Sequence, residues 1–334
     1  MRKKEKLLYK DGIKNVDGYK FSVLKPKEKI VITLIIVSFI ISSICSVLDS
    51  FNVISINDIE NDLGIIDGVS RQNCNFAVYC LDVGQSDCTV IICNDKVLMI
   101  DTGTANQLNT IRESLKSLDI STIDYMIITH PHDDHIGSAS FLIDDFDVRN
   151  VLMCEIYGDA DLNYSYYQLL DSISRNNVNK IDAEPGLTFK IGNAWICVFA
   201  PIETDDELNN NSIVVKVVYG ETSFLFQGDA EATVERDLIE SQFNLDADVL
   251  KLGHHGSNTS STVEFLEEVT PFAGIISCGN DNTYSHPNGN VIDRLDDLGI
   301  DSFATSFSGD ITIVSDGTNI TVITENGENT VYNQ

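Results

Sequence analysis

The sequence has few of the residues that dominate fibrous or low-complexity chains. Its 334 residues include 21 Gly and 6 Pro, and no segment repeats at a fixed period. These features exclude a collagen-like, low-complexity or repeat protein. Apolar residues make up 43% of the chain and charged residues 22%, which is normal for a globular protein. The length suits one large domain or two ordinary ones.

Positive charge is scarce and unevenly distributed. The chain has 22 Lys and Arg against 51 Asp and Glu, a formal net charge of −29. Residues 1–29 hold ten of the basic residues and four acidic ones, a net charge of +6, so the other 305 residues carry −35. Nucleic-acid affinity comes largely from neutralised phosphates. The strong negative charge of residues 30–334 therefore excludes a tight, sequence-specific DNA-binding function.

Residues 30–48 contain no charged residue, no Pro and no Gly. As a helix, this stretch would be roughly 30 Å long, the thickness of the hydrocarbon core of a membrane. We expect one transmembrane helix at 30–48, preceded by a basic cytoplasmic tail at 1–29 and followed by a linker at 49–72. The positive-inside rule then predicts a single-pass protein of the cell membrane with its body outside the cytoplasm.

A cleaved signal peptide is the main alternative for this segment. Signal peptides have shorter apolar runs and end in small residues. Here the small residues Ser42, Ser43, Cys45 and Ser46 are interrupted by Ile44. An uncleaved anchor is therefore the better interpretation.

The eight cysteines include no CxxC pair. Zinc sites built from cysteine pairs are therefore not expected. Several cysteines fall within apolar, strand-like runs, so we expect buried free thiols. A location outside the cytoplasm would permit one or two disulfides.

The body of the chain, residues 73–334, has no Pro/Gly-rich linker and is predicted to form one domain. Short β-like runs and helical stretches alternate along it, and their mixed order predicts an α/β fold with two sheets covered by helices. The expected strands are 76–83, 87–93, 96–101, 125–129, 148–154, 194–200, 212–219, 223–227, 247–252, 272–277, 311–314 and 321–324. The expected helices are 107–118, one from about 137, one between 230 and 241, 262–268 and 290–298.

Histidine is rare and concentrated in three places. The chain has six histidines, three of them in the HPHDDH run that follows a predicted strand: His130, His132 and His135. Imidazole and carboxylate are ligands for zinc, iron or manganese. Alternation along an extended loop would put His130 and His132 on one side, while Asp134 and His135 face a second ion. Two ions could stabilise a phosphoryl or carbonyl group and activate a water.

A second acidic position follows the predicted strand 223–227. Asp229 lies in a Gly-Asp turn between this strand and a helix. A Gly-Asp turn alone is weak evidence for a site. Combined with the histidine run, it indicates a carboxylate placed to bridge two ions.

These motifs together resemble the metallo-β-lactamase-fold hydrolases, and most of all the hydrolase domain of ComEC-type competence proteins and their stand-alone relatives. The resemblance extends from about residue 76 to 290 and implies a four-layer αβ/βα sandwich with metals at one edge. It rests on HPHDDH at 130–135, QGDA at 227–230, LDVGQSD at 81–87, IDTG at 100–103, NNNS at 209–212, LGHHGS at 252–257 and SHP at 285–287.

The resemblance also implies roles for individual residues. The implied ligands of two divalent ions are His130 and His132 for the first, Asp134, His135 and His255 for the second, and Asp229 as the bridge. His255 is favoured over its neighbour as a ligand. The expected catalytic residues are Asp134, His254, which would contact the substrate, and His286, which would bind the substrate or protonate the leaving group. Asp101 would hold the histidine loop from behind.

One departure from the lactamase pattern affects the metal. Lactamase-like members carry a third histidine on the first ion about twenty residues before the bridging carboxylate. This chain has Asn210 and Asn211 there instead, as is typical of the ComEC-like group, and we expect both to support the site from outside the ligand set. With fewer nitrogen ligands, manganese becomes as plausible as zinc.

The leading interpretation is a metal-dependent phosphodiesterase or nuclease that acts outside the membrane. Its expected partners are a small or polymeric phosphodiester, single-stranded DNA bound weakly, and the membrane through the N-terminal helix. Two alternatives are a cell-envelope phosphodiesterase resembling teichoic-acid phosphorylcholine esterases and a non-catalytic metal-binding surface module. A lactamase fits less well without the third histidine. One predicted span also excludes a DNA channel formed by this chain alone.

Overall fold

The computed structural model describes residues 13–16, 19–22, 75–154, 162–280 and 282–333. The chain divides into two units, residues 1–69 and 70–334. In the first unit, strands β1 (Ile13–Val16) and β2 (Tyr19–Ser22) form an antiparallel hairpin, which the sequence did not predict. The predicted transmembrane helix at 30–48 and linker at 49–72 lie outside the described residues. Within the described ranges, no helix combines the length and apolar character needed to cross a membrane.

The second unit contains a nine-stranded sheet. Strands β3, β4 and β5 form an antiparallel meander, and β7, β9 and β10 extend it in parallel. The chain returns at its end to add β18, β19 and β20 beside β3. In spatial order the strands are β10 (Asn179–Asp182), β9 (Asn150–Met153), β7 (Tyr125–Ile128), β5 (Lys96–Ile100), β4 (Thr89–Cys93), β3 (Phe76–Cys80), β18 (Ile311–Ser315), β19 (Ile320–Thr324) and β20 (Asn329–Tyr332).

A seven-stranded sheet packs against the first one. Its first four strands are antiparallel neighbours, and from β14 onwards the strands are parallel. In order they are β11 (Thr188–Ile191), β12 (Ala194–Ala200), β13 (Val214–Tyr219), β14 (Thr222–Phe226), β15 (Val249–Lys251), β16 (Ala273–Ile276) and β17 (Asp301–Ala304).

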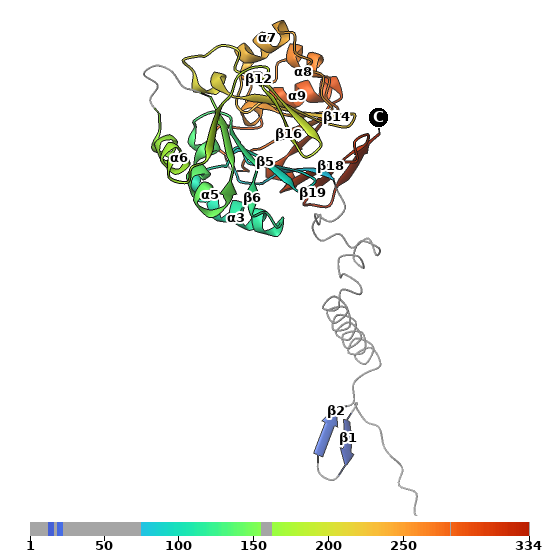
Figure 1. The fold of residues 1–334 in the computed structure, drawn as a ribbon. Helices are drawn as coiled ribbons and strands as arrows, with labels where there is room; N and C mark the ends of the chain where they lie inside the picture. Colours follow the sequence, from blue (N-terminus) through green and yellow to red (C-terminus); the bar gives the residue numbers. More distant parts are fainter. Residues whose placement is uncertain (1–12, 17–18, 23–74, 155–161, 281, 334) are drawn as a thin grey trace, which may run out of the picture. The chain divides into compact units, whose positions relative to one another are not determined.

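Helices cover the outer faces of both sheets (Figure 1). The first sheet carries α3 (Leu108–Ser117), α5 (Ala139–Asp145) and α6 (Tyr164–Arg175), and the second carries α7 (Ala232–Glu240), α8 (Val263–Val269) and α9 (Gly289–Leu298). Residues of β3 alternate between layers, because Val78 lies in the core between the sheets while Ala77 and Tyr79 face the helices. This arrangement confirms the predicted αβ/βα sandwich.

Short elements complete the second unit. They are β6 (Thr122–Ile123), β8 (Asp147–Val148), α4 (Asp133–Ile136), α10 (Thr305–Ser308), and the 3-10 turns η1 (Ala105–Gln107), η2 (Leu208–Asn211) and η3 (Gly253–Gly256).

The sequence did not predict helix α6 or the edge strands β10, β11, β17 and β20. In α6, buried Tyr166, Leu169 and Ile173 form a narrow apolar stripe among Ser and Tyr residues of modest helix propensity. The strands β10 and β20 are largely exposed and polar, so their residues lack the apolar alternation of a buried strand.

The six cysteines in the described ranges are all free. Cys197 is half-buried, and the others are buried: Cys80, Cys88, Cys93, Cys154 and Cys278. This agrees with the buried thiols expected from the sequence.

At Gly192 the second sheet packs closely against the backbone of the first sheet. Gly192, in the turn between β11 and β12, has φ +54°, and a Cβ there would lie 2.4 Å from the carbonyl oxygen of Cys93 on β4. Gly299, which ends α9, has a similar φ of +71° with open space around it.

Replacing Gly192 or Gly299 by alanine should therefore lower the free energy of unfolding by different amounts. Gly299→Ala should lower the free energy of unfolding by about 1–2 kcal/mol, the cost of a left-handed alanine. Gly192→Ala should cost that amount plus about 1–3 kcal/mol, because the methyl group must push the sheets apart. Urea unfolding of the two variants beside the parent chain measures both values. Equal losses would contradict the inter-sheet contact.

Candidate metal centre

The chemically important residues lie at the edge where strands from both sheets end. In the first sheet, Asp101 follows β5 and the histidine loop follows β7, and these strands are parallel. In the second sheet, Asp229 follows β14 and the His254-His255 pair follows the parallel strand β15. Because parallel strands bring their carboxyl ends to one edge, these four segments converge.

Close backbone contacts bring the two halves of this edge together. The Ile213 N–H, just before β13 of the second sheet, donates to the Thr129 carbonyl of the first sheet at 3.0 Å. Within the second sheet, the His254 N–H donates to the Gly228 carbonyl at 3.0 Å. Gly228 has φ +56°, and a Cβ there would lie 2.8 Å from the Cβ of Thr129. The absence of a side chain at Gly228 thus lets the Asp229 turn approach the histidine loop.

Asp229 lies at the centre of the cluster. Its carboxylate oxygens are 3.3 Å from His135 Nε2, 3.7 Å from His130 Nε2 and 3.7 Å from His255 Nε2. It is 2% exposed, and its backbone N–H donates to Ser212 Oγ at 3.0 Å. A carboxylate surrounded by imidazole nitrogens in this way has the position expected of a bridging ligand.

Four overlapping groups of side chains have the spacing of a metal site, and two of them consist only of the expected ligands. His130, His135 and Asp229 form the first, and Asp134, His135 and His255 form the second, with all ligand atoms of each group within 4.8 Å of one another. In the second group, His255 Nε2 lies 3.4 Å from Asp134 Oδ2. The structure therefore brings together the residues expected to hold the second ion.

His132 adjoins the first group without being part of either. Its Nδ1 lies 3.0 Å from His130 Nε2, and the side chain is half-buried at the rim. The two rings meet nearly edge-on, with their centroids 4.7 Å apart. His130 and His132 thus face each other, as their alternation in the loop predicts.

The donor set fits divalent cations. Three buried ligand atoms in the cluster have no hydrogen-bond partner: His135 Nε2, Asp229 Oδ1 and His255 Nε2. Buried polar atoms are normally satisfied, because leaving them unpaired is costly. Imidazole nitrogens and carboxylate oxygens facing one another would be satisfied by zinc, iron or manganese ions between them.

The charges of these groups agree with a ligand role. Burial alone would favour a neutral acid, but the rings of His135 and His255 outweigh it and hold the pKa of Asp229 well below its usual value. Burial and the neighbouring His135 keep the pKa of His130 well below its usual value, so this ring is neutral at pH 7. Ionised carboxylate and neutral imidazole are the forms that bind metals.

His135 differs from His130 because two carboxylates contact it. Burial opposes the charged ring, yet Asp229 and Asp101 outweigh it and raise the pKa of His135 well above its usual value. A cation that binds His135 Nε2 would therefore displace a proton.

Asp101 holds the histidine loop from behind. Its carboxylate accepts hydrogen bonds from the Thr129 N–H at 2.8 Å and the Thr129 hydroxyl at 2.7 Å. The same carboxylate lies 2.8 Å from His135 Nδ1, which orients Nε2 toward Asp229. This carboxylate–imidazole arrangement is common behind metal-binding histidines, and it places Asp101 where the resemblance predicts.

Asn211 holds its own loop, and Asn210 joins that loop to the segment after the Asp229 turn. The amide of Asn211 donates to the carbonyls of Asp205 and Glu207, and its oxygen accepts from the Asp205 N–H. Asn210 bonds to the Asp205 carboxylate and accepts from the Glu231 N–H at 3.4 Å. The residue from this run that contacts the cluster is Ser212, whose hydroxyl lies 3.3 Å from His130 Nδ1.

The two adjacent histidines of η3 have different environments. The side chain of His255 is 2% exposed and faces the cluster, while that of His254 is 24% exposed. His254 Nδ1 lies 3.1 Å from Glu231 Oε1, and its Nε2 is 3.8 Å from Asp229. This favours His255 as the ligand and places His254 at the rim, where a substrate would arrive.

His286 lies beside these two rings. Its centroid is 5.7 Å from that of His254 and 6.2 Å from that of His255. Burial, with His255 and His254 nearby, lowers the pKa of His286 to about 4. The Gln85 side-chain amide donates to His286 Nδ1 at 3.1 Å, so the neutral ring carries its proton on Nε2. His286 can donate a hydrogen bond at neutral pH but is not a charged acid there.

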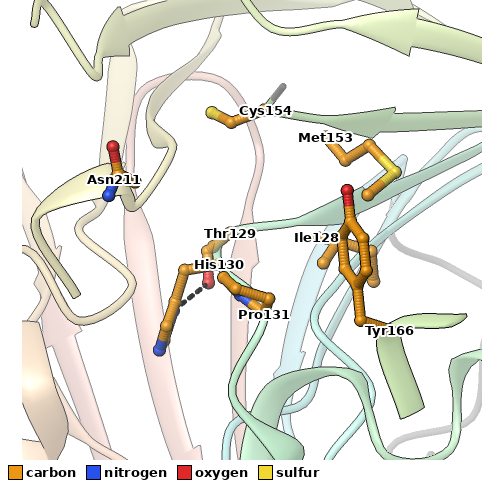
Figure 2. A pocket seen from close by; sticks show the side chains of 8 residues that line it. All are labelled: Ile128, Thr129, His130, Pro131, Met153, Cys154, Tyr166 and Asn211. Atoms are coloured by element: carbon orange, nitrogen blue, oxygen red, sulfur yellow. Dashed lines mark hydrogen bonds between the residues drawn. The ribbon is translucent and has the colours of Figure 1, made fainter. Parts of the chain in front are cut away.

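A small recess next to His130 does not offer room for a substrate. Asn211 and Tyr166 lie on opposite sides of it, with His130 and Pro131 between them (Figure 2). Its volume of about 10 Å³ is enough for at most a single water molecule. This recess is therefore not the substrate-binding site.

Several residues that support the site were not predicted from the sequence. Glu235 on α7 accepts from the Gln227 amide at 2.9 Å, and Gln227 in turn accepts from the Gly253 N–H at 3.0 Å. This connects the Asp229 turn to the histidine pair. Asp87 and Lys251 form a buried ion pair against the cluster. Both lie in or beside the recognised motifs, but their pairing depends on contacts between the sheets.

A solved structure with the same overall arrangement is that of CmlA, described as a diiron beta-hydroxylase from Streptomyces venezuelae. The similarity has a TM-score of 0.52 with 14% sequence identity, over 78% of this chain and 59% of that one. At this identity the likeness concerns the fold alone.

Two curated relatives are competence proteins. The chain is 30% identical over 198 residues to ComE operon protein 3 of Bacillus subtilis (strain 168), which covers 59% of this chain and 25% of that protein. It is 30% identical over 236 residues to Competence protein ComA of Neisseria gonorrhoeae, covering 70% of this chain and 31% of that protein. The chain thus spans a quarter to a third of these relatives, and the similarity confirms the predicted resemblance to ComEC-type proteins.

The sequence pattern of the Metallo-beta-lactamase superfamily matches residues 81–279, which is more than half of the chain. The matched region includes the histidine loop, the Asp229 turn and the His254-His255 pair. Together with the four-layer fold, this match shows that the chain belongs to the metallo-beta-lactamase superfamily.

Proposed function

We propose that this chain is a membrane-anchored, extracytoplasmic hydrolase that uses two divalent metal ions to cleave phosphodiesters. The observation that carries the proposal is the central position of Asp229, together with the unpaired buried atoms of His135, His255 and Asp229 itself. Such a cluster supports a dinuclear centre of zinc or manganese. The resemblance to ComEC-type competence proteins points to single-stranded DNA as one substrate.

The residues divide into ligands and substrate contacts. His130, His132 and Asp229 would hold the first ion, and Asp134, His135 and His255 the second, with Asp229 shared between them. Two bound ions supply electrostatic stabilisation of the attacking and leaving oxygens and a water of lowered pKa.

Two histidines at the rim would bind the substrate. His286, held by Gln85, would donate its Nε2–H to a non-bridging phosphate oxygen. His254, oriented by Glu231, would contact the substrate from the other side of the entrance. Because His286 is neutral at pH 7, its role is to bind and orient rather than to deliver a proton as a charged acid.

The acidic body favours weak binding of a polymeric substrate. Lys251, the basic residue that adjoins the cluster in the described part of the chain, is buried and paired with Asp87. It is therefore not available to a phosphate. Substrate affinity would depend on the ions and on neutral side chains, which also suits a small phosphodiester of the cell envelope.

Membrane attachment rests on the uncharged run at residues 30–48 and the basic residues before it. We expect the full-length chain to stay with the membrane fraction after alkaline carbonate washing and to be released when residues 1–48 are deleted. Recovery of the full-length chain in the wash would contradict the anchor.

The central carboxylate gives a direct test of the activity. Asp229→Asn should lower the hydrolysis of bis-p-nitrophenyl phosphate by about a hundredfold or more, since a lost bridging ligand removes several kcal/mol of transition-state stabilisation. Initial rates with Mn²⁺ or Zn²⁺ added to the metal-free full-length chain measure this loss.

The matched control is Asp297→Asn on the exposed face of α9, which should keep the parent rate. Chelation of the parent chain should abolish its activity, and added metal should restore it. The proposal fails if the parent chain hydrolyses nitrocefin but no phosphodiester. It also fails if Asp229→Asn keeps the parent rate.

The charge of the body predicts an unusual response to salt. A protein with six to ten cationic phosphate contacts loses roughly 10³–10⁵ in DNA affinity between 50 and 200 mM salt. Here kcat/KM for single-stranded DNA should fall less than about tenfold over that range, because few counterions are released. Cleavage of a labelled oligonucleotide at both salt concentrations measures the difference. A steep decline would indicate a basic DNA-binding surface and contradict this account.

A further inference from the structure

Asp87 and Lys251 form an ion pair between the two sheets, next to the candidate metal centre. Asp87 lies on the loop between β3 and β4, and Lys251 is the last residue of β15. The Lys251 Nζ is 2.9 Å from Asp87 Oδ1 and 3.0 Å from Oδ2. The residues are 5% and 3% exposed. Two packed apolar residues would stabilise a fold at least as well as such a pair, so its presence calls for another role.

The carboxylate of Asp87 lies behind His255 as seen from the candidate ions. Its Oδ1 is 3.6 Å from His255 Nδ1, which also lies 3.0 Å from the Ser277 carbonyl oxygen. The opposite ring nitrogen, Nε2, faces Asp134 at 3.4 Å and Asp229 at 3.7 Å. Nδ1 therefore faces protein acceptors while Nε2 faces the cluster.

The same order of groups occurs on the other side of the centre. There the Asp101 carboxylate contacts His135 Nδ1 at 2.8 Å, and His135 Nε2 faces Asp229 at 3.3 Å. A carboxylate behind a metal-binding histidine orients the ring and strengthens the ligand. Asp87 has the corresponding place behind His255, but at 3.6 Å it acts on the ring through its charge, while the Ser277 carbonyl accepts the hydrogen bond from Nδ1.

The backbone of Asp87 also reaches the second group of ligands. Its N–H donates to the Asp134 carbonyl at 3.1 Å, and its own carbonyl accepts from the Gly103 N–H at 2.8 Å. Asp87 is thus fixed between the loop that carries Asp134 and the loop that carries Asp101. Asp87 thus adjoins two of the three residues expected around the second ion: its carboxylate faces the His255 ring, and its N–H holds the backbone of Asp134.

We propose that Asp87 is a positioning residue for the second ion, acting through His255 and Asp134, and that Lys251 is the internal cation that holds the Asp87 carboxylate in place. This inference rests on the proposed dinuclear function. Asp87, Asp229 and His255 lie close enough to form a metal group of their own. By binding both oxygens of Asp87, Lys251 keeps that carboxylate behind the histidine and out of the ligand set.

The test removes both charges together, because a single substitution would leave the other charge buried without a partner. Metal-free full-length Asp87→Asn/Lys251→Met is titrated with Zn²⁺ by calorimetry, and its thermal midpoint is measured without metal. We expect native affinity for one ion and about ten- to hundredfold weaker binding of the other, the usual effect of losing such a partner. The thermal midpoint of the metal-free protein should stay within a few degrees of the parent value.

The matched control is Asp124→Asn/Lys96→Met. This Lys–Asp pair, 2.9 Å apart, joins the start of β5 to the residue before β7, at the opposite end of strands that lead to the site. Its lysine is half-exposed, and Asp124 also pairs with Arg149 at 2.7 Å, so the control tests the loss of one carboxylate and one cation far from the ligands. It should leave the binding of both ions unchanged. A second readout is the Zn²⁺ affinity of Lys251→Arg, which keeps the cation and should bind the second ion more tightly than the double variant.

The outcomes separate this inference from the proposed function. If the Asp87 double variant binds two ions with the parent affinities, the positioning role is wrong while the hydrolase proposal stands. Equal weakening of both ions with a lowered thermal midpoint would show a structural role only and also overturn the inference. A parent chain that binds no Zn²⁺ or Mn²⁺ and cleaves no phosphodiester would overturn both.

Discussion

The site depends on the approach of one buried carboxylate to several imidazoles. Asp229 comes from the second sheet, while His130 and His135 come from the first. Without a cation between them, three buried ligand atoms, on His135, Asp229 and His255, have no hydrogen-bond partner. The charges around them favour ionised Asp229 and neutral His130. Such an arrangement is stable only when the surrounding loops hold it rigidly, and most of the hydrogen bonds near the centre serve that purpose.

The sandwich supplies this rigidity through strand ends. Parallel strands in each sheet deliver their carboxyl ends to one edge, so short turns suffice to present each side chain. Behind the ligands stands a layer of carboxylates and amides, among them Asp101, Glu235 and Gln227. These groups connect one ligand loop to the next. The binding groups are therefore placed by the cores of both sheets and not by the loops alone.

Much of this could be predicted from residue types alone. Histidine is rare in the chain, and a run such as His130 to His135 has few structural explanations, so the ligand candidates and the strand before them were identified from the sequence. The motifs also indicated the four layers. What the sequence could not show is pairing between distant segments. Asp87 and Lys251 are separated by 164 positions, and nothing in either neighbourhood indicates the other. Ser212 was noted only as part of an asparagine-rich run, although its hydroxyl contacts the cluster, whereas Asn211 holds its own loop and Asn210 bonds to Glu231. Helix α6 was missed because its apolar stripe is narrow.

The close packing at Gly228 affects how metal binding contributes to the stability of the fold. At this position the backbone of one sheet's turn touches Thr129 of the other sheet with no side chain between them. The spacing of the two half-sites is thus set by a main chain packed against the short, fully buried side chain of Thr129, which has little freedom to adjust. Ions bound between the halves would join the sheets, so their binding energy would contribute to the stability of the whole sandwich. Metal supply would then govern how long the folded protein survives as well as whether it is active.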